Sequence, residues 1–255
     1  MRPETEVLES PSGLTIYHKG PSLGLGPLPS IFYFAATGRE SLDLNPFNEL
    51  VLFLENDPIH IFSFTIPGHG QDLTPSEVMS FWADEMAHDR NPIDEFLQQS
   101  LSSIEYLIEK EYSDPNRLAT AGLSRGGFLA THLAACDPRL RIILGFAPIT
   151  QLAALGEFKE LNHHMVSSLS LTSIKDKLID KKLRYYIGNR DLKVGTQECF
   201  QFVHDLTETA YAKGFRSPQA ELIITPSIGH KGHGTPLSSF HDGAEWLRKQ
   251  LENKH

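Results

Sequence analysis

Residues 117 to 135 read RLATAGLSRGGFLATHLAA, and this stretch decides the fold. Its first part, residues 117 to 122, is a short apolar run typical of a buried strand, and residues 128 to 135 follow a helical pattern. Between them stands Gly122-Leu123-Ser124-Arg125-Gly126-Gly127, a G-x-S-x-G sequence. A serine on so sharp a strand-to-helix turn holds a strained backbone, and flanking glycines remove the Cβ atoms that would clash there. The hydroxyl of Ser124 is therefore predicted to project above the end of a sheet.

The same turn supplies an anion-stabilising element. The first N–H groups of a helix have no partner within the helix and lie at its positive dipole end. The backbone N–H of Arg125 is the natural first donor to an oxyanion formed at Ser124. A serine between glycines can also be a plain turn, and the strand before it and the helix after it favour the catalytic interpretation.

Short apolar runs alternate with stretches of helical period from residue 30 onward, which is the pattern of parallel strands joined by crossover helices. Two further runs flank Pro11-Ser12-Gly13 and predict a hairpin at the N-terminus. The pattern predicts an α/β fold with a mostly parallel, eight-stranded sheet covered by helices on both faces. The predicted strands are Glu6–Glu9, Leu14–His18, Ser30–Thr37, Ile59–Ile66, Arg117–Gly122, Arg141–Pro148, Leu183–Asn189 and Ala220–Thr225.

The best-defined predicted helix spans Pro92 to Tyr112, because apolar residues recur there at steps of three and four. Residues 151 to 182 are the least regular part of the chain, and we interpret them as a small cap or lid inserted over the sheet. A chain of 255 residues is compatible with one compact domain, so residues 1–255 are expected to form a single domain that contains this insertion.

Two candidate partners for Ser124 lie just after predicted strands, at the carboxyl edge where parallel sheets build their sites. A neutral serine needs a histidine as base, and the histidine needs a carboxylate to orient it. Asp191 follows the strand at 183–189, and His230 follows the strand at 220–225. His233 is a rival for the role of base, but distance from the strand end favours His230 and leaves His233 as a possible pocket residue. The His-x-x-His spacing carries no glutamate base and lies in a glycine-rich loop, so no metal site is predicted.

These landmarks, together with Pro67-Gly68-His69-Gly70, resemble those of the α/β-hydrolase superfamily, in particular its dienelactone-hydrolase-like and prolyl-oligopeptidase-like members. The resemblance implies an α/β-hydrolase fold, with Ser124 as nucleophile, Asp191 as triad acid and His230 as general base. Many relatives carry a His-Gly pair after the third strand that helps to hold the oxyanion.

Here that loop reads Ala36-Thr37-Gly38-Arg39, so the histidine is absent. The second oxyanion N–H is assigned to Gly38 or Arg39. Beside the turn at residues 122–127, hereafter the elbow, Leu123 and His69 are candidate pocket residues.

The composition of the chain limits the classes of molecule that it is expected to bind and the compartment in which it is expected to act. The net charge of −9 without a basic stripe disfavours nucleic acid, and no apolar run is long enough to span a bilayer. The N-terminus lacks the apolar stretch of a secretory signal, and two cysteines do not make a disulfide framework, so a cytoplasmic location is expected. A small-molecule substrate is expected, and the triad chemistry requires no cofactor.

The expected function is that of a serine hydrolase working through an acyl-enzyme, with a carboxylesterase acting on a small ester as the leading case. A thioesterase or a small-peptide serine peptidase would use the same residues. A non-catalytic binding protein that retains the fold is the alternative from another class.

Overall fold

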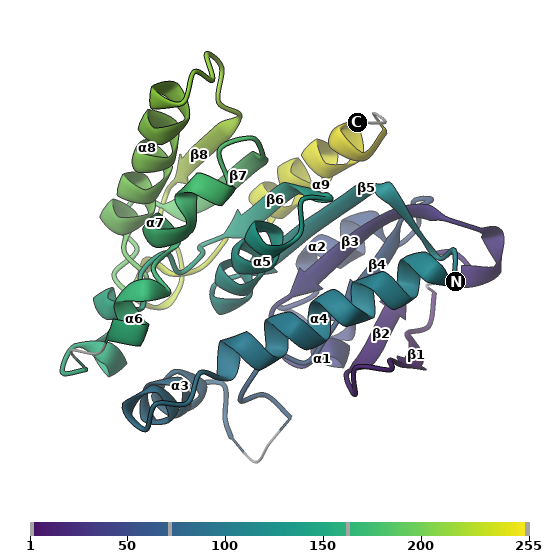
Figure 1. Ribbon diagram of the computed structural model, residues 1–255, viewed down its shortest axis with the longest axis horizontal. Coiled ribbons are helices and arrows are strands. Elements are labelled where there is room, and N and C mark those ends of the chain that lie inside the picture. Colours follow the sequence, from purple (N-terminus) through teal and green to yellow (C-terminus); the bar gives the residue numbers. More distant parts are fainter. Residues whose placement is uncertain (1–2, 71–72, 162–163, 253–255) are drawn as a thin grey trace.

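The computed structural model describes residues 3–70, 73–161 and 164–252, and within them the strands form one eight-stranded sheet. Its strand order is β1-β2-β4-β3-β5-β6-β7-β8 (Figure 1). The N-terminal hairpin pairs antiparallel, β2 joins β4 antiparallel, and every later pairing is parallel. The strands are β1 Glu6–Glu9, β2 Thr15–Lys19, β3 Leu28–Phe34, β4 His60–Ser63, β5 Ser113–Leu123, β6 Leu140–Phe146, β7 Lys182–Gly188 and β8 Ala220–Thr225. The predicted fold class is confirmed.

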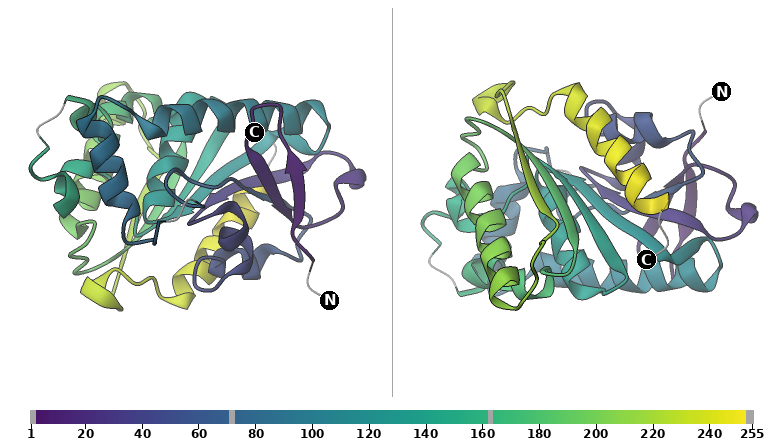
Figure 2. Two further views of the ribbon diagram at one scale, coloured as in Figure 1. Left: turned by 90° about the horizontal axis from the view of Figure 1, so that it is seen from below. Right: turned by 90° about the horizontal axis from the view of Figure 1, so that it is seen from above.

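Helices cover both faces of this sheet. The views in Figure 2 show α4 and α9 on opposite sides of it. One apolar core lies under α3, α4, α5 and α8, and a second lies under α1, α2 and α9. The helices are α1 Gly38–Asp43, α2 Glu49–Leu54, α3 Val78–Ala87, α4 Pro92–Glu109, α5 Arg125–Cys136, α6 His164–Ser168, α7 Leu171–Ile174, α8 Thr196–Ala212 and α9 Leu237–Glu252. In the part of the chain that the structure describes, no helix is long and apolar enough to cross a membrane.

The parallel pairing brings the functional loops to one edge. Gly122 at the end of β5 pairs with Phe34 of β3 and with Gly145 of β6, and Phe146 pairs with Tyr186 of β7. The carboxyl ends of β3, β5, β7 and β8 therefore open on the same side, where the loops after them meet.

The segment 151–182, predicted to be a cap, links β6 to β7 as a series of short helices. These are η2 Leu152–Ala154, η3 Gly156–Phe158, α6, α7 and η4 Lys175–Lys177. Its apolar side chains, among them Leu152, Phe158 and Leu171, are buried in the larger core, and η3 contacts α3. The segment is thus anchored by packing, and its action as a lid stays a prediction.

Candidate active site

The turn between β5 and α5 holds Ser124 in a strained backbone conformation. Its φ is 55° and its ψ is −114°, a region that residues with a Cβ rarely occupy. The backbone around it is held on both sides, because its N–H donates to the Phe146 carbonyl at 2.8 Å and its own carbonyl accepts from Gly127 and Ile149. These bonds tie the elbow to the end of β6 and fix the direction of the hydroxyl.

Two glycines make this turn possible. A Cβ on Gly122 would lie 2.2 Å from the carbonyl carbon of Gly126, and a Cβ on Gly126 would lie 1.9 Å from the carbonyl oxygen of Phe34. Both contacts are with backbone, which cannot move aside without disturbing the sheet. The predicted reason for the flanking glycines therefore matches the packing of the elbow.

His233, not His230, stands between the serine and the carboxylate. Its Nε2 lies 2.9 Å from the Ser124 Oγ, and its Nδ1 lies 2.7 Å from the Asp191 Oδ2. An ionised carboxylate can only accept a hydrogen bond, so Nδ1 carries the proton and Nε2 is left to accept from the serine hydroxyl. The prediction that His230 is the base is wrong, whereas the structure joins Ser124 and Asp191 through the histidine that was its rival.

The path of the loop after β8 explains why His233, and not His230, reaches Ser124. Ile228 and Gly234 pair across it, with the Gly234 N–H donating to the Ile228 carbonyl at 2.8 Å, so the chain doubles back. His230 lies at the tip of this loop, is exposed, and lines a cavity. His233 lies on the returning arm. Distance along the chain from the strand end is therefore no guide to which histidine reaches the serine.

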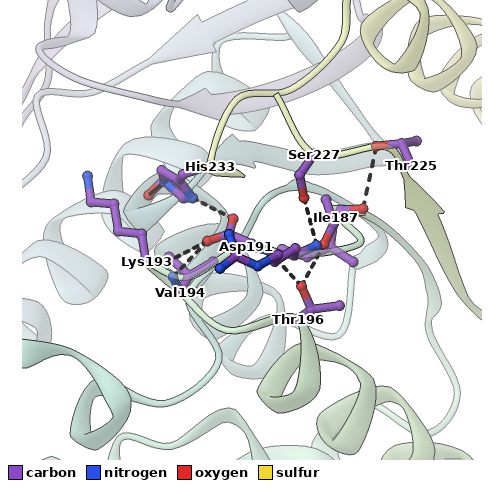
Figure 3. Close-up of polar contacts among 11 residues, drawn as sticks. Ile187, Asp191, Lys193, Val194, Thr196, Thr225, Ser227 and His233 are labelled. Atoms are coloured by element: carbon purple, nitrogen blue, oxygen red, sulfur yellow. Dashed lines mark hydrogen bonds and ion pairs between the residues drawn. The ribbon is translucent and has the colours of Figure 1, made fainter. Parts of the chain in front are cut away.

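A network of hydrogen bonds fixes Asp191 (Figure 3). Its Oδ1 accepts from the backbone N–H groups of Lys193 and Val194 at 2.8 and 3.0 Å, and its own N–H donates to the Thr196 hydroxyl. The side chain is fully buried. Burial by itself raises the pKa of Asp191, but the hydrogen bond and charge of His233 and the two backbone donors outweigh it and lower the pKa. The carboxylate therefore stays ionised and able to orient the imidazole.

The loops after β7 and β8 are also bonded directly to each other. The Arg190 N–H donates to the Ser227 hydroxyl, and the Leu192 N–H donates to the Lys231 carbonyl. Gly232 fits between them, because a Cβ there would lie 2.2 Å from the Arg190 carbonyl oxygen. Asp191 and His233 thus belong to one bonded unit.

The backbone N–H groups predicted to hold the oxyanion differ in whether they already have an acceptor. Arg125 is the first residue of α5, and its N–H donates to no acceptor in the described chain. The Gly38 N–H instead donates to the Thr65 hydroxyl at 3.0 Å, so its assignment as the second donor is wrong in this structure. The segment predicted to be a loop begins helix α1, and Thr37 and Glu40 form a capping box at its N-terminus. The Glu40 N–H donates to the Thr37 hydroxyl, and the Thr37 N–H donates to the Glu40 carboxylate. Arg39, in the first turn of α1, stays a prediction.

A cavity of about 690 Å³ opens beside Ser124. It is bounded by the loop before α3, the start of α5, the segment around η3, and the loops after β7 and β8. Its lining residues include Pro75, Met79, Ser124, Arg125, Ile149, Leu155, Glu157, Lys159, Lys193, Val194, His230 and Lys231.

Two residues predicted for the pocket lie elsewhere. Leu123 packs against the core under α1, α2 and α9. His69 lines a second cavity beside α3 and α4, and burial is the main cause that lowers its pKa to about 4.

The fold, with a serine, a histidine and an aspartate in one hydrogen-bonded chain at its elbow, defines a serine hydrolase of the α/β-hydrolase type. A sequence model of the Prolyl oligopeptidase family matches residues 82–254, and the chain belongs to this family. The resemblance stated from the motifs is thereby confirmed.

Individual relatives are distant. The "Acylamino-acid-releasing enzyme" of Arabidopsis thaliana is 23% identical over 182 residues, which cover 60% of this chain and 22% of that protein. The structure of TT1662 from Thermus thermophilus superposes with a TM-score of 0.73 at 19% identity, over 99% of this chain and 100% of that one. An acylaminoacyl peptidase from Pyrococcus horikoshii superposes with a TM-score of 0.68 at 14% identity, over 99% of this chain and 41% of that one. The chain thus spans less than half of both named enzymes.

Proposed function

We propose that Ser124, His233 and Asp191 form a catalytic triad that transfers an acyl group to water. The observation that carries the proposal is the unbroken chain from the Ser124 Oγ through His233 to the Asp191 Oδ2, with links of 2.9 and 2.7 Å. Both distances are within the range that proton transfer and charge stabilisation require.

The chemistry follows from the donor and acceptor roles. His233 Nε2 takes the hydroxyl proton as Ser124 attacks an acyl carbonyl, and Asp191 stabilises the imidazolium that forms. The Arg125 N–H donates to the oxyanion at the positive end of α5. The imidazolium then returns its proton to the leaving group, and His233 activates a water molecule that cleaves the acyl-enzyme.

The proposed substrate class is a small carboxylic ester. The cavity beside Ser124 has the volume of a small-molecule site, and its apolar wall, which includes Met79, Ile149 and Val194, can receive an acyl chain. We expect covalent labelling by a fluorophosphonate probe, and turnover of 4-nitrophenyl acetate and butyrate, both abolished in Ser124→Ala. A folded wild-type protein that is neither labelled nor active on any ester would favour the non-catalytic alternative.

Peptide hydrolysis is the second candidate, supported by membership of the Prolyl oligopeptidase family. Matched acyl-amino-acid 4-nitrophenyl esters and 4-nitroanilides separate the two, because they differ only in the bond cleaved. An esterase is expected to turn over the esters and leave the anilides nearly untouched. Anilide turnover approaching that of the esters would support the peptidase instead.

A further inference from the structure

The charge of the cavity beside Ser124 is opposite to that of the protein. The chain carries a net charge of −9, yet the cavity is lined by four basic side chains, Arg125, Lys159, Lys193 and Lys231. Glu157 is the one carboxylate in the described lining. The lining therefore produces a local positive field at the site where substrate must bind.

Arg125 is the most deeply placed of these cations, since it directly follows the nucleophile and is half-buried, while the three lysines are exposed. Its Nη2 donates to the Pro75 carbonyl at 2.8 Å, which fixes the side chain against the loop before α3. Its Nη1 is shielded from solvent and has no acceptor in the described chain. Arg125 thus lines the cavity with a guanidinium whose N–H groups are only partly used by described acceptors.

Within residues 3–70, 73–161 and 164–252, no carboxylate forms an ion pair with this guanidinium. Glu157 acts on it only through its charge, from beyond ion-pair distance. Burial lowers the pKa of Arg125, and burial followed by the charge of Arg125 lowers the pKa of Lys193. A partly desolvated cation without a counter-ion is unfavourable, and an anion that binds beside it removes this penalty.

We propose that the cavity selects substrates that carry a carboxylate close to the bond that is cleaved, and that the Arg125 side chain is the residue that recognises it. This specificity rests on the proposed hydrolase function and deepens it. The backbone N–H of Arg125 is directed to the oxyanion and its guanidinium to the substrate carboxylate, so one residue beside the nucleophile couples recognition to the chemistry. The carboxylate can belong to the acyl part or to the leaving group, and the two are separated by experiment.

The test uses pairs of esters that differ only in charge. Mono-4-nitrophenyl adipate against 4-nitrophenyl hexanoate places the charge on the acyl part, and 4-carboxyphenyl butyrate against 4-carbamoylphenyl butyrate places it on the leaving group. Rates in the presence of Ser124→Ala are subtracted as the uncatalysed background. A hydrogen bond to a charged group predicts that kcat/KM favours the anionic member of one pair by about 10- to 100-fold.

Arg125→Gln is expected to remove most of this preference, so that kcat/KM falls by about 10- to 100-fold more on the anionic ester than on its neutral counterpart. Arg216→Gln is the matched control, because it removes the same charge from an exposed position between α8 and β8. The preference should shrink in 1 M salt, which screens the field. Equal losses on anionic and neutral esters in Arg125→Gln, or a wild-type preference for neutral esters in both pairs, would overturn the proposal.

A binding measurement keeps this test separate from the proposed hydrolysis. Ser124→Ala is titrated calorimetrically with 4-carboxyphenyl butyrate, mono-4-nitrophenyl adipate and their neutral counterparts, which need not be cleaved to be compared. Tighter binding of an anionic ester, lost when Arg125→Gln is added, supports the carboxylate site even if the wild type proves inactive. Equal binding within both pairs refutes it even if the wild type hydrolyses every ester.

Discussion

Replacing His233 and His230 one at a time distinguishes the base from its neighbour in the same loop. In His233→Ala, the Ser124 hydroxyl loses the imidazole acceptor at 2.9 Å, and Asp191 loses the imidazole donor at 2.7 Å. A general base contributes about 10²- to 10⁴-fold, and removing the histidine of a triad, which also disables the nucleophile, costs up to about 10⁶-fold. We therefore expect kcat to fall by at least about 10⁴-fold in His233→Ala.

The same change has a structural cost that can be separated from the catalytic one. The Asp191 Oδ1 keeps its two backbone donors, but Oδ2 is left without its partner in a fully buried side chain. Leaving a buried carboxylate without its partner costs about 3 to 5 kcal/mol of unfolding free energy. Because a domain is stable by about 5 to 15 kcal/mol, the variant should remain folded, with a lower denaturation midpoint than the wild type.

The assay follows the rate of fluorophosphonate labelling and the turnover of 4-nitrophenyl acetate, with circular dichroism as the check on folding. His230→Ala is the matched control, because His230 is exposed at the tip of the loop and has no bond to Ser124. It should keep its activity within about threefold. If His230→Ala lost labelling while His233→Ala retained it, the geometric assignment would be refuted.

Three further outcomes follow from burial and backbone geometry. Burial lowers the pKa of His18 and of His60 from 6.5 to about 4, so the folded state binds fewer protons than the unfolded state. The free energy of unfolding should therefore fall as pH drops from 6.5 towards 4, by up to about 1.4 kcal/mol per pH unit for each histidine. Equal urea midpoints at pH 7 and pH 5 would contradict this. Gly126→Ala should not fold, because its Cβ would meet a β3 carbonyl at 1.9 Å, whereas Gly156→Ala, with no atom within 4 Å, should match the wild type in thermal melting. Ser124→Gly should raise unfolding free energy by about 1 kcal/mol or more over Ser124→Ala by relieving a strained φ of 55°, and no difference in denaturation would exclude that strain.

The sheet could be predicted because its signal is local. The strands β6, β7 and β8 coincide with short apolar runs that differ from the helical stretches on either side, and the predicted bounds of β8, Ala220–Thr225, are those observed. The short helices α1 and α2, of six residues each, gave no such signal. Six residues span fewer than two helical turns, which is too little to establish a period of 3.6. The sequence therefore predicts a loop with free N–H groups after β3, where the structure has α1.

The sequence predicts correctly only those site residues that lie close to the end of a strand. Ser124 lies directly at the end of β5 and Asp191 three residues beyond β7, so the sheet itself places them. His233 lies eight residues beyond β8, and its position depends on the pairing of Ile228 with Gly234. That pairing, and the fit of Gly232 against the loop after β7, are contacts between distant segments. No pattern within the loop itself separates the two histidines.

The distribution of strain and charge around the elbow indicates how the site is organised. Ser124 holds an unfavourable backbone conformation, and the guanidinium of Arg125 has a buried Nη1 with no acceptor among the described residues. Both would be destabilising in an ordinary surface turn, and both persist because β3, β6 and the loop before α3 hold the elbow through backbone contacts. A substrate with an acyl carbonyl and a nearby carboxylate would bring an oxyanion to the free N–H of Arg125 and an anion to its side chain. The features that are least favourable in the free protein are thus the ones that such a substrate would satisfy, which is the arrangement expected of a preorganised site.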